Sequence, residues 1–284
     1  MKRSLLLLTL SLLATFQNLC PVFAQEETVL EAIARTGVLK VALREDAPPF
    51  GYQNPNGVRV GFCLDFFEEL EDALKELLKR EVLLVKIFES TLVNRFDVVE
   101  NKLVHLECGP NTIRDIKDKQ ITFSTPFWVS GTQFLVSNSS SDPVNINSSM
   151  DGVKIGVLRY TTTEALLNRR YPDAEIKKFQ GVTGRRRGVQ AMKQGRIQAF
   201  AGDGILLLGE AVLQNLQEFQ LIPNLPLDCE YYGLILPEND DKWQTLVNSV
   251  IRSKDSAYLY REWFGTRLSR ILASTEDHCT AIEQ

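Results

Sequence analysis

The chain has 284 residues, of which 44% are hydrophobic and 24% are charged, and its formal net charge is −4. These values are typical of a soluble globular protein, and the length is sufficient for two domains of ordinary size. The acidic balance argues against nucleic acid as a partner, because the phosphates would repel the chain.

The first 24 residues have the pattern of a secretory signal peptide. Lys2 and Arg3 form a basic region, residues 4–13 are a short apolar run, and residues 22–24 offer small side chains for cleavage after Ala24. A membrane anchor is the less favoured alternative, because the run is shorter than the ~20 residues that span a bilayer. Cleavage would remove two positive charges and no acid, which lowers the net charge to −6.

Four cysteines would remain after cleavage, and an even number in an exported protein favours two disulfides. Three connectivities are possible, of which Cys63–Cys108 with Cys229–Cys279 is favoured, and four buried thiols are the alternative. Closing a loop of about 46 residues with the first bond would stabilise the fold by roughly 4 kcal/mol in the chain-entropy treatment.

The first half of the chain alternates between strand and helix patterns. Residues 38–43, 82–88 and 103–106 are short apolar runs typical of buried strands, and residues 65–79 carry hydrophobic side chains at helical spacing. This rhythm predicts an α/β unit with a mostly parallel, doubly wound sheet. A Ser/Asn-rich stretch at 137–149 interrupts it.

The same rhythm then restarts and predicts a second α/β unit. Its expected elements are strands at 153–158, 174–179 and 197–201 and helices at 162–170, 185–194 and 205–216. A late strand at 231–236 and amphipathic helices at 241–252 and 256–264 are expected to pack back onto the first unit. The tail from Thr266 is polar and is predicted to be loose apart from Cys279.

Two polar stretches, at 107–114 and 159–164, each follow a predicted strand and open a predicted helix. Backbone N–H groups and the helix dipole both favour an anion at such a position. In open α/β sheets the ligand lies beyond the carboxyl ends of the strands. Two such stretches facing each other would therefore hold a small charged molecule.

Signals for catalysis, metals and cofactors are weak. His105 and His278 lie outside any metal-ligand cluster, so we predict a satisfied strand histidine and a tail histidine. The sequence has no G-x-S-x-G, phosphate-loop or H-E-x-x-H motif, and the glycines at 181–188 fit no nucleotide fingerprint. We therefore predict no catalytic residue, no metal and no cofactor.

Several short motifs occur in an order that points to a known family. Residues 41–50 read VALREDAPPF, 60–65 read VGFCLD, 109–112 read GPNT, 123–127 read FSTPF, 161–162 read TT and 195–203 read GRIQAFAGD. From about residue 37 to residue 264 the chain resembles the polar amino-acid solute-binding proteins of ABC importers, the bacterial extracellular solute-binding family 3. Arg44-Glu45, Glu107-Cys108-Gly109 and Gly131-Thr132 are most similar to the glutamate/aspartate-binding branch.

The resemblance implies a type II periplasmic-binding-protein fold, with two α/β lobes joined by two crossover strands and closing on the ligand by a hinge motion. It places residues 25–134 and 230–284 in lobe 1 and residues 135–229 in lobe 2, with strands 131–136 and 231–236 pairing at the hinge. It further implies a monomer in the periplasm that binds a small-molecule amino acid, acidic or polar, and delivers it to the membrane permease of an ABC importer.

The resemblance also assigns roles to residues that hold the ammonium and α-carboxylate of the ligand. Asp203 would accept from the ammonium in a charge-assisted bond, or it caps the helix that follows. Thr112, Thr161 and Thr162 would donate to the α-carboxylate, although plain N-capping also explains the last two. Tyr160 replaces the glycine that is usual in the family.

The cation that clamps the α-carboxylate is either Arg114 or Lys117, and we favour Arg114. An arginine offers a planar two-point fork whereas a lysine is a point charge, so the two are not equivalent. The residue that is not used would be solvated surface.

The specificity for the side chain of the ligand is expected to come from Arg44, Arg185 and Phe50. The two arginines would suit an anionic side chain, and the Phe50 ring would pack on its apolar stem. The alternatives are an ion pair of Arg44 with Glu45 or Asp46, an exposed helix face for Arg185 and a plain core position for Phe50.

Two other functions are compatible with the resemblance. Dehydratases that act on cyclic amino acids such as arogenate share the fold, and such an enzyme would need Glu107 or Glu164 as its general acid. A periplasmic ligand sensor that docks on a membrane receptor is the other alternative.

Overall fold

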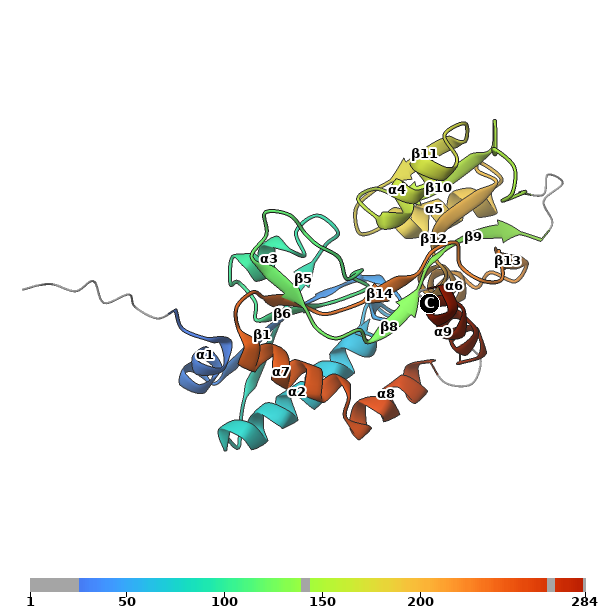
Figure 1. Cartoon of the computed structure of the whole chain (residues 1–284). Coiled ribbons are helices and arrows are strands. Elements are labelled where there is room, and N and C mark those ends of the chain that lie inside the picture. The colour runs from blue at the N-terminus through green and yellow to red at the C-terminus, as the bar shows by residue number, and fades with distance from the viewer. Residues whose placement is uncertain (1–25, 139–143, 265–268, 283–284) are drawn as a thin grey trace, which may run out of the picture.

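The computed structural model describes residues 26–138, 144–264 and 269–282, and it places them in two α/β lobes (Figure 1). The predicted signal peptide lies outside the described residues. None of the described helices is long and apolar enough to cross a membrane.

The first lobe is built on a five-stranded sheet in the order β5 (Leu84–Ser90), β1 (Val38–Arg44), β6 (Leu106–Cys108), β15 (Ile235–Pro237) and β7 (Ile121–Phe123). β1 runs parallel to β5 and β6, whereas β15 runs antiparallel to β6 and β7. The carboxyl ends of the three parallel strands therefore meet at one edge, where Arg44, Ser90 and Cys108 end them.

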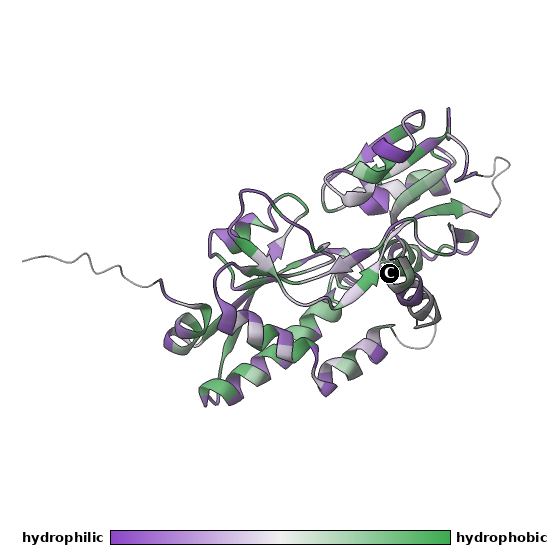
Figure 2. Ribbon diagram, in the orientation of Figure 1, coloured by the Kyte–Doolittle hydropathy of each residue, from purple (hydrophilic) through white to green (hydrophobic). Residues whose placement is uncertain are grey.

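Helix α2 (Phe62–Leu78) contributes one buried face to the core of this lobe. Its buried side chains recur at helical spacing, at Phe62, Phe66, Phe67, Leu70 and Leu74, and α2 is largely green in Figure 2. The helix packs against α7 (Asp241–Ile251) and α8 (Lys254–Phe264), as the sequence predicts. Shorter elements complete the lobe: α1 (Val29–Thr36), α3 (Asp97–Glu100) and a small sheet of β2 (Asp46–Ala47), β3 (Gly51–Gln53) and β4 (Arg59–Val60).

The second lobe repeats the pattern with the order β11 (Glu175–Phe179), β10 (Lys154–Leu158), β12 (Ala199–Asp203), β9 (Thr132–Ser137) and β13 (Phe219–Ile222). β10 is parallel to β11 and β12, and β9 is antiparallel to β12 and β13. Helices α4 (Thr162–Arg170), α5 (Gly184–Lys193) and α6 (Gly204–Leu213) pack on this sheet. The predicted α/β rhythm is confirmed in both lobes, with an antiparallel part in each sheet.

The hinge differs from the prediction. β8 (Trp128–Ser130) pairs antiparallel with β14 (Glu230–Tyr232), so the predicted pairing of 131–136 with 231–236 is wrong. Gly131 explains the offset, because a Cβ at this position would lie 1.9 Å from the backbone oxygen of Asp228. Only glycine fits so close an approach, and after it the chain leaves β8 and enters the second sheet as β9.

Both favoured disulfides are present, Cys63–Cys108 and Cys229–Cys279. The second joins the residue before β14 to α9 (Ser269–Ile282), which packs on β8. The prediction of a loose tail is therefore wrong in its described part. Thr275 and Cys279 are buried one helical turn apart, and this anchored face explains why the polar segment is helical.

Candidate ligand-binding site

The first part of the site is a buried cluster of arginines, which we call the cationic end: Arg44, Arg95 and Arg185, with the acids Asp46 and Glu107. Arg44 ends β1, is 1% exposed and donates from Nε to Asp46 Oδ1 at 2.6 Å. Its Nη2 is buried and has no hydrogen-bond partner among the described residues. Burial would raise the pKa of Asp46, but the charge and hydrogen bond of Arg44 outweigh it and the pKa is lowered.

Arg95 and Arg185 approach Arg44 from different elements. Arg95 lies between β5 and α3, its buried Nε has no partner among the described residues, and burial together with the charge of Arg44 lowers its pKa to about 9. Arg185 comes from α5 of the second lobe and donates from Nε to the backbone oxygen of Asp46 at 3.4 Å. The predicted pair of Arg44 and Arg185 is therefore brought together, and Arg95 is a member that the sequence reasoning missed.

Glu107 only partly compensates these cations. It is fully buried, and it accepts from Ser90 Oγ at 2.7 Å and from Asn111 Nδ2 at 2.5 Å. Burial raises the pKa of Glu107 despite these bonds and the nearby arginines. Three arginines thus face two acids, and burial disfavours the charged form of one of these acids, Glu107, so the cationic end can accept an anion.

A pocket of 500 Å³ opens beside this cluster, between the lobes. Its lining includes Glu45 and Asp46 of the first lobe and Thr183 and Arg186 of the second. The backbones of the lobes also approach closely nearby, since a Cβ at Gly209 in α6 would lie 2.4 Å from the Pro48 oxygen.

The second part of the site, the anionic end, consists of Asp203 and Glu230 with their hydroxyl partners. Asp203 ends β12 and accepts from the Tyr232 hydroxyl at Oδ2 and from Thr163 Oγ1 at Oδ1, the latter at 3.4 Å. Its side chain makes no capping bond to α6, so the capping alternative is not realised. Burial raises the pKa of Asp203.

Glu230, which the sequence reasoning also missed, opens the hinge strand β14 and is 5% exposed. Burial, followed by the charge of Asp203, raises the pKa of Glu230 to about 7. The hydroxyls of Thr112 and Thr162 are close enough to oppose this shift. Glu230 is therefore the point at which the predicted residues Thr112, Thr162 and Asp203 converge from the two lobes.

The two ends belong to one site. Arg185 interacts electrostatically with both Asp46 and Asp203, and Arg44 interacts with Tyr232, whose hydroxyl donates to Asp203. The charged groups of the cationic end and the anionic end therefore interact electrostatically across the boundary between the lobes.

Three other predicted residues, Thr161, Arg114 and Lys117, lie less centrally. Thr161 is the N-cap of α4, accepting from the Glu164 N–H at 3.1 Å and donating to the Leu158 oxygen at 2.8 Å. Arg114 is exposed, but its charge reaches Glu230. Lys117 is exposed and makes no hydrogen bond or ion pair with any described residue, whereas the charge of Arg114 acts on Glu230.

Phe50 is not brought to the surface of the site. It is 0% exposed and packs edge-on against Tyr232, with ring centroids 5.6 Å apart, inside an aromatic group that also contains Phe127 and Trp128. Phe50 therefore packs against Tyr232 from the core and not from the ligand side.

Tyr160 is exposed at φ 65°, a conformation that glycine adopts without strain.

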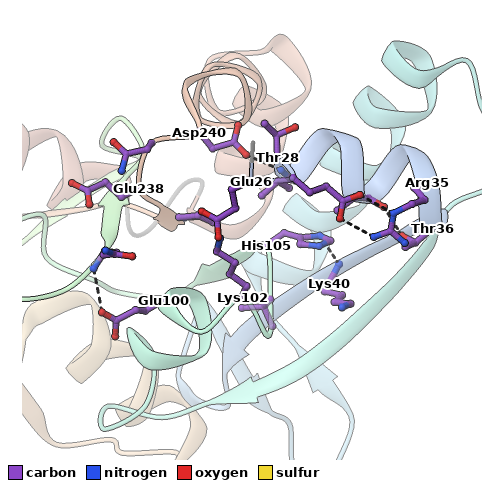
Figure 3. A pocket seen from close by; sticks show the side chains of 17 residues that line it. Glu26, Thr28, Arg35, Thr36, Lys40, Glu100, Lys102, His105, Glu238 and Asp240 are labelled. Carbon is purple, nitrogen blue, oxygen red and sulfur yellow. Dashed lines mark hydrogen bonds and ion pairs between the residues drawn. The ribbon is translucent and has the colours of Figure 1, made fainter. Parts of the chain in front are cut away.

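A separate pocket of 370 Å³ lies around α1 and does not include these residues (Figure 3). Its charges are largely paired with one another, as in Arg35 with Glu27 and Lys102 with Glu26. His105 lines it with Nδ1 accepting from the Lys40 N–H at 3.1 Å, which confirms the satisfied histidine. In the described part of the chain no group of three or more His, Cys, Asp or Glu side chains could hold a metal.

Comparison with known proteins identifies the family. Residues 39–266 match the family model of the bacterial extracellular solute-binding proteins, family 3. The chain belongs to this family. Two relatives are the glutamate/aspartate import solute-binding proteins of Salmonella typhimurium and Escherichia coli, 27% and 28% identical over 239 and 241 residues. Each alignment covers 84% of this chain and 78% of the relative.

Solved structures agree on the fold of this family 3 protein. The crystal structure of an ancestral amino acid-binding protein, described as a precursor of cyclohexadienyl dehydratase, superimposes with a TM-score of 0.69 at 22% identity. The match covers 84% of this chain and 99% of that one. The predicted two-lobed fold and family are thereby confirmed, and amino-acid binding is the function that the family shares with these relatives.

Proposed function

We propose that this protein captures an acidic amino acid, glutamate or aspartate, between its lobes and delivers it to the permease of an ABC importer. The observation that carries the proposal is the excess of buried arginine at one end of the site, where Arg44 Nη2 and Arg95 Nε have no hydrogen-bond partner in the described part of the chain. Buried donors without partners cost free energy, so a carboxylate at this place would be strongly favoured.

The other contacts follow from the two ends of the site. The side-chain carboxylate of the ligand would bind Arg44, Arg95 and Arg185. The ammonium of the ligand would bind at Asp203, with which Arg185 interacts electrostatically. The α-carboxylate would meet Thr112, Thr162 and the N-terminus of α4 that Thr161 caps, with Arg114 as the clamping cation and Lys117 in reserve. Phe50 would contribute indirectly, by packing against the Tyr232 ring and so positioning the Tyr232 hydroxyl that donates to Asp203.

The relatives support this choice of ligand, because two of them are named as glutamate/aspartate import solute-binding proteins. The proposal includes removal of residues 1–24, a location in the periplasm and a monomer with lobe 1 at 25–134 and 230–284 and lobe 2 at 135–229. Closure would occur about the paired strands β8 and β14.

Calorimetric titration of residues 25–284 with all twenty amino acids tests the proposal, after unfolding and refolding to remove carried-over ligand. We expect tight binding of glutamate or aspartate and much weaker binding of lysine and leucine. Binding confined to basic or apolar amino acids would contradict it.

Glu107 favours one second candidate, a dehydratase, because burial raises its pKa as a general acid requires. Its two oxygens, however, already accept from Ser90 and Asn111. The other candidate acid, Glu164, is ion-paired with Lys178, and this contact helps to lower its pKa against the effect of burial. Turnover of prephenate or arogenate by the purified protein would favour the enzyme.

A further inference from the structure

Glu230 is a buried carboxylate at the hinge that the roles above leave unused. It lies opposite Ser130 in the short ladder between β14 and β8 and is 5% exposed. Its Oε2 is buried and has no hydrogen-bond partner among the described residues. A buried acceptor without a donor is costly, so this atom points to a missing donor.

The neighbours of Glu230 define which donor would fit. Asp203 and Asp228 add negative charge beside it, Tyr232 interacts with it, and Arg114 is the cation whose charge reaches it. Both oxygens of Asp203 already accept protein hydrogen bonds, from Tyr232 and Thr163. An ammonium beside Asp203 carries three donors, and the free Glu230 Oε2 offers an acceptor that Asp203 does not.

We propose that Glu230 is a second acceptor for the ligand ammonium, binding it through Oε2 beside Asp203. The inference rests on the proposed function, since it requires an amino acid in the site. Thr112 and Thr162 act on Glu230 from opposite lobes, so the surroundings of this carboxylate depend on both lobes. Recognition of the ammonium is thereby linked to closure.

The proposal fixes the direction of proton exchange on binding. Burial and Asp203 raise the pKa of Glu230 to about 7 with the lobes together, so near pH 7 this carboxylate is partly protonated until an ammonium contacts it. An ammonium stabilises the ionised form and lowers this pKa, so the proton is released. The α-carboxylate of the same ligand competes with Glu230 for Thr112 and Thr162 and so opposes this effect by raising the pKa, and net proton release therefore shows that the ammonium contact with Glu230 prevails.

Calorimetry at pH 7 in buffers of different ionisation enthalpy measures this exchange on the mature chain without any substitution. We expect wild type to release up to about half a proton from Glu230 per L-glutamate bound. Proton uptake, or no exchange, would overturn the proposal.

The substitution Glu230→Gln then locates the effect. We expect it to weaken L-glutamate binding at least tenfold and to reduce proton release, while the affinity for glutarate, which has both carboxylates and no ammonium, stays within twofold. Glu238→Gln, at an exposed glutamate just after β15, is the matched control and should change neither. Equal losses for L-glutamate and glutarate would show a purely structural role and overturn the inference.

These outcomes separate the inference from the function on which it rests. Wild type that binds no amino acid overturns both. Wild type that binds L-glutamate, with Glu230→Gln binding it equally well, overturns the Glu230 inference alone. If another amino acid is the ligand, the same measurements apply to that amino acid and its desamino analogue.

Discussion

The cationic and anionic ends of the site are both clusters of buried charged groups, but the cationic end has an excess of positive charge and the anionic end an excess of negative charge. At the cationic end the three arginines outnumber the acids, and one of the two acids, Glu107, has a raised pKa. At the anionic end Asp203 and Glu230 lie together and burial raises the pKa of both. Each end alone is an unfavourable cluster of like charges, whereas a ligand with separated charges would relieve both.

The ends also differ in how they are assembled. Arg44 and Arg95 belong to the first lobe and are joined by Arg185 of the second, so the cationic end is made mostly by one lobe. Glu230 lies on the hinge itself, with Thr112 and Thr162 reaching it from the two lobes. We infer that the cationic end selects the ligand side chain and the anionic end senses closure.

The largest expected effect comes from removing the cation that ends β1. Arg44→Ala should weaken L-glutamate binding by roughly 2–5 kcal/mol, because it takes away a buried charged partner of the ligand carboxylate. L-Glutamine has no such carboxylate and should lose much less, which calorimetry on both ligands will show.

A control variant and two contradicting outcomes keep this test specific to the cationic end. Arg35→Ala removes an exposed arginine that pairs with Glu27 and should leave binding unchanged. A loss for L-glutamate smaller than tenfold, about 1.4 kcal/mol, would contradict the role of Arg44. A variant that loses both ligands equally would show that the Arg44–Asp46 pair acts only as a structural support.

The two disulfides provide the next test, because each adjoins a key glutamate: Cys108 follows Glu107 and Cys229 precedes Glu230. Their sequence separations are 45 and 50, so the chain-entropy treatment predicts that each contributes about 4 kcal/mol. Urea unfolding of the Cys63→Ala/Cys108→Ala and Cys229→Ala/Cys279→Ala variants should give nearly equal losses. A much smaller loss for the second pair would mean that α9 does not anchor the hinge.

The sequence was sufficient to predict the features that depend on local pattern. Helical spacing of the phenylalanines and leucines in α2 and the short apolar runs of β1, β10 and β12 correspond to elements of the structure. Arg44 and Asp203 each end a parallel strand, one in each lobe, at the end where ligands lie in such sheets, but it was the resemblance to family 3 that assigned their roles.

The misses depend on contacts between residues distant in sequence. Arg95 lies in an ordinary surface-like sequence, and only folding buries it beside Arg44 and Glu107. Glu230 belongs to a strand whose pairing partner was predicted incorrectly, because the tight approach of Gly131 to Asp228 has no local signal beyond one glycine. The helix α9 is likewise anchored by a disulfide to a distant residue.

The smallest predicted effect comes from a substitution at the anionic end. Unlike Arg44→Ala, this substitution should not discriminate between L-glutamate and L-glutamine. Asp203→Asn keeps the shape of the side chain but removes the charge that the ammonium meets, so it should cost about 1.5–3 kcal/mol of binding. Every α-amino acid carries the same ammonium, so L-glutamate and L-glutamine should weaken by the same factor and their affinity ratio should stay constant. Asp151→Asn, at an exposed turn, is the matched control. A changed ratio would mean that Asp203 also acts on the side chain of the ligand through Arg185, and the two ends would then have to be treated as one charge network rather than as separate recognition elements.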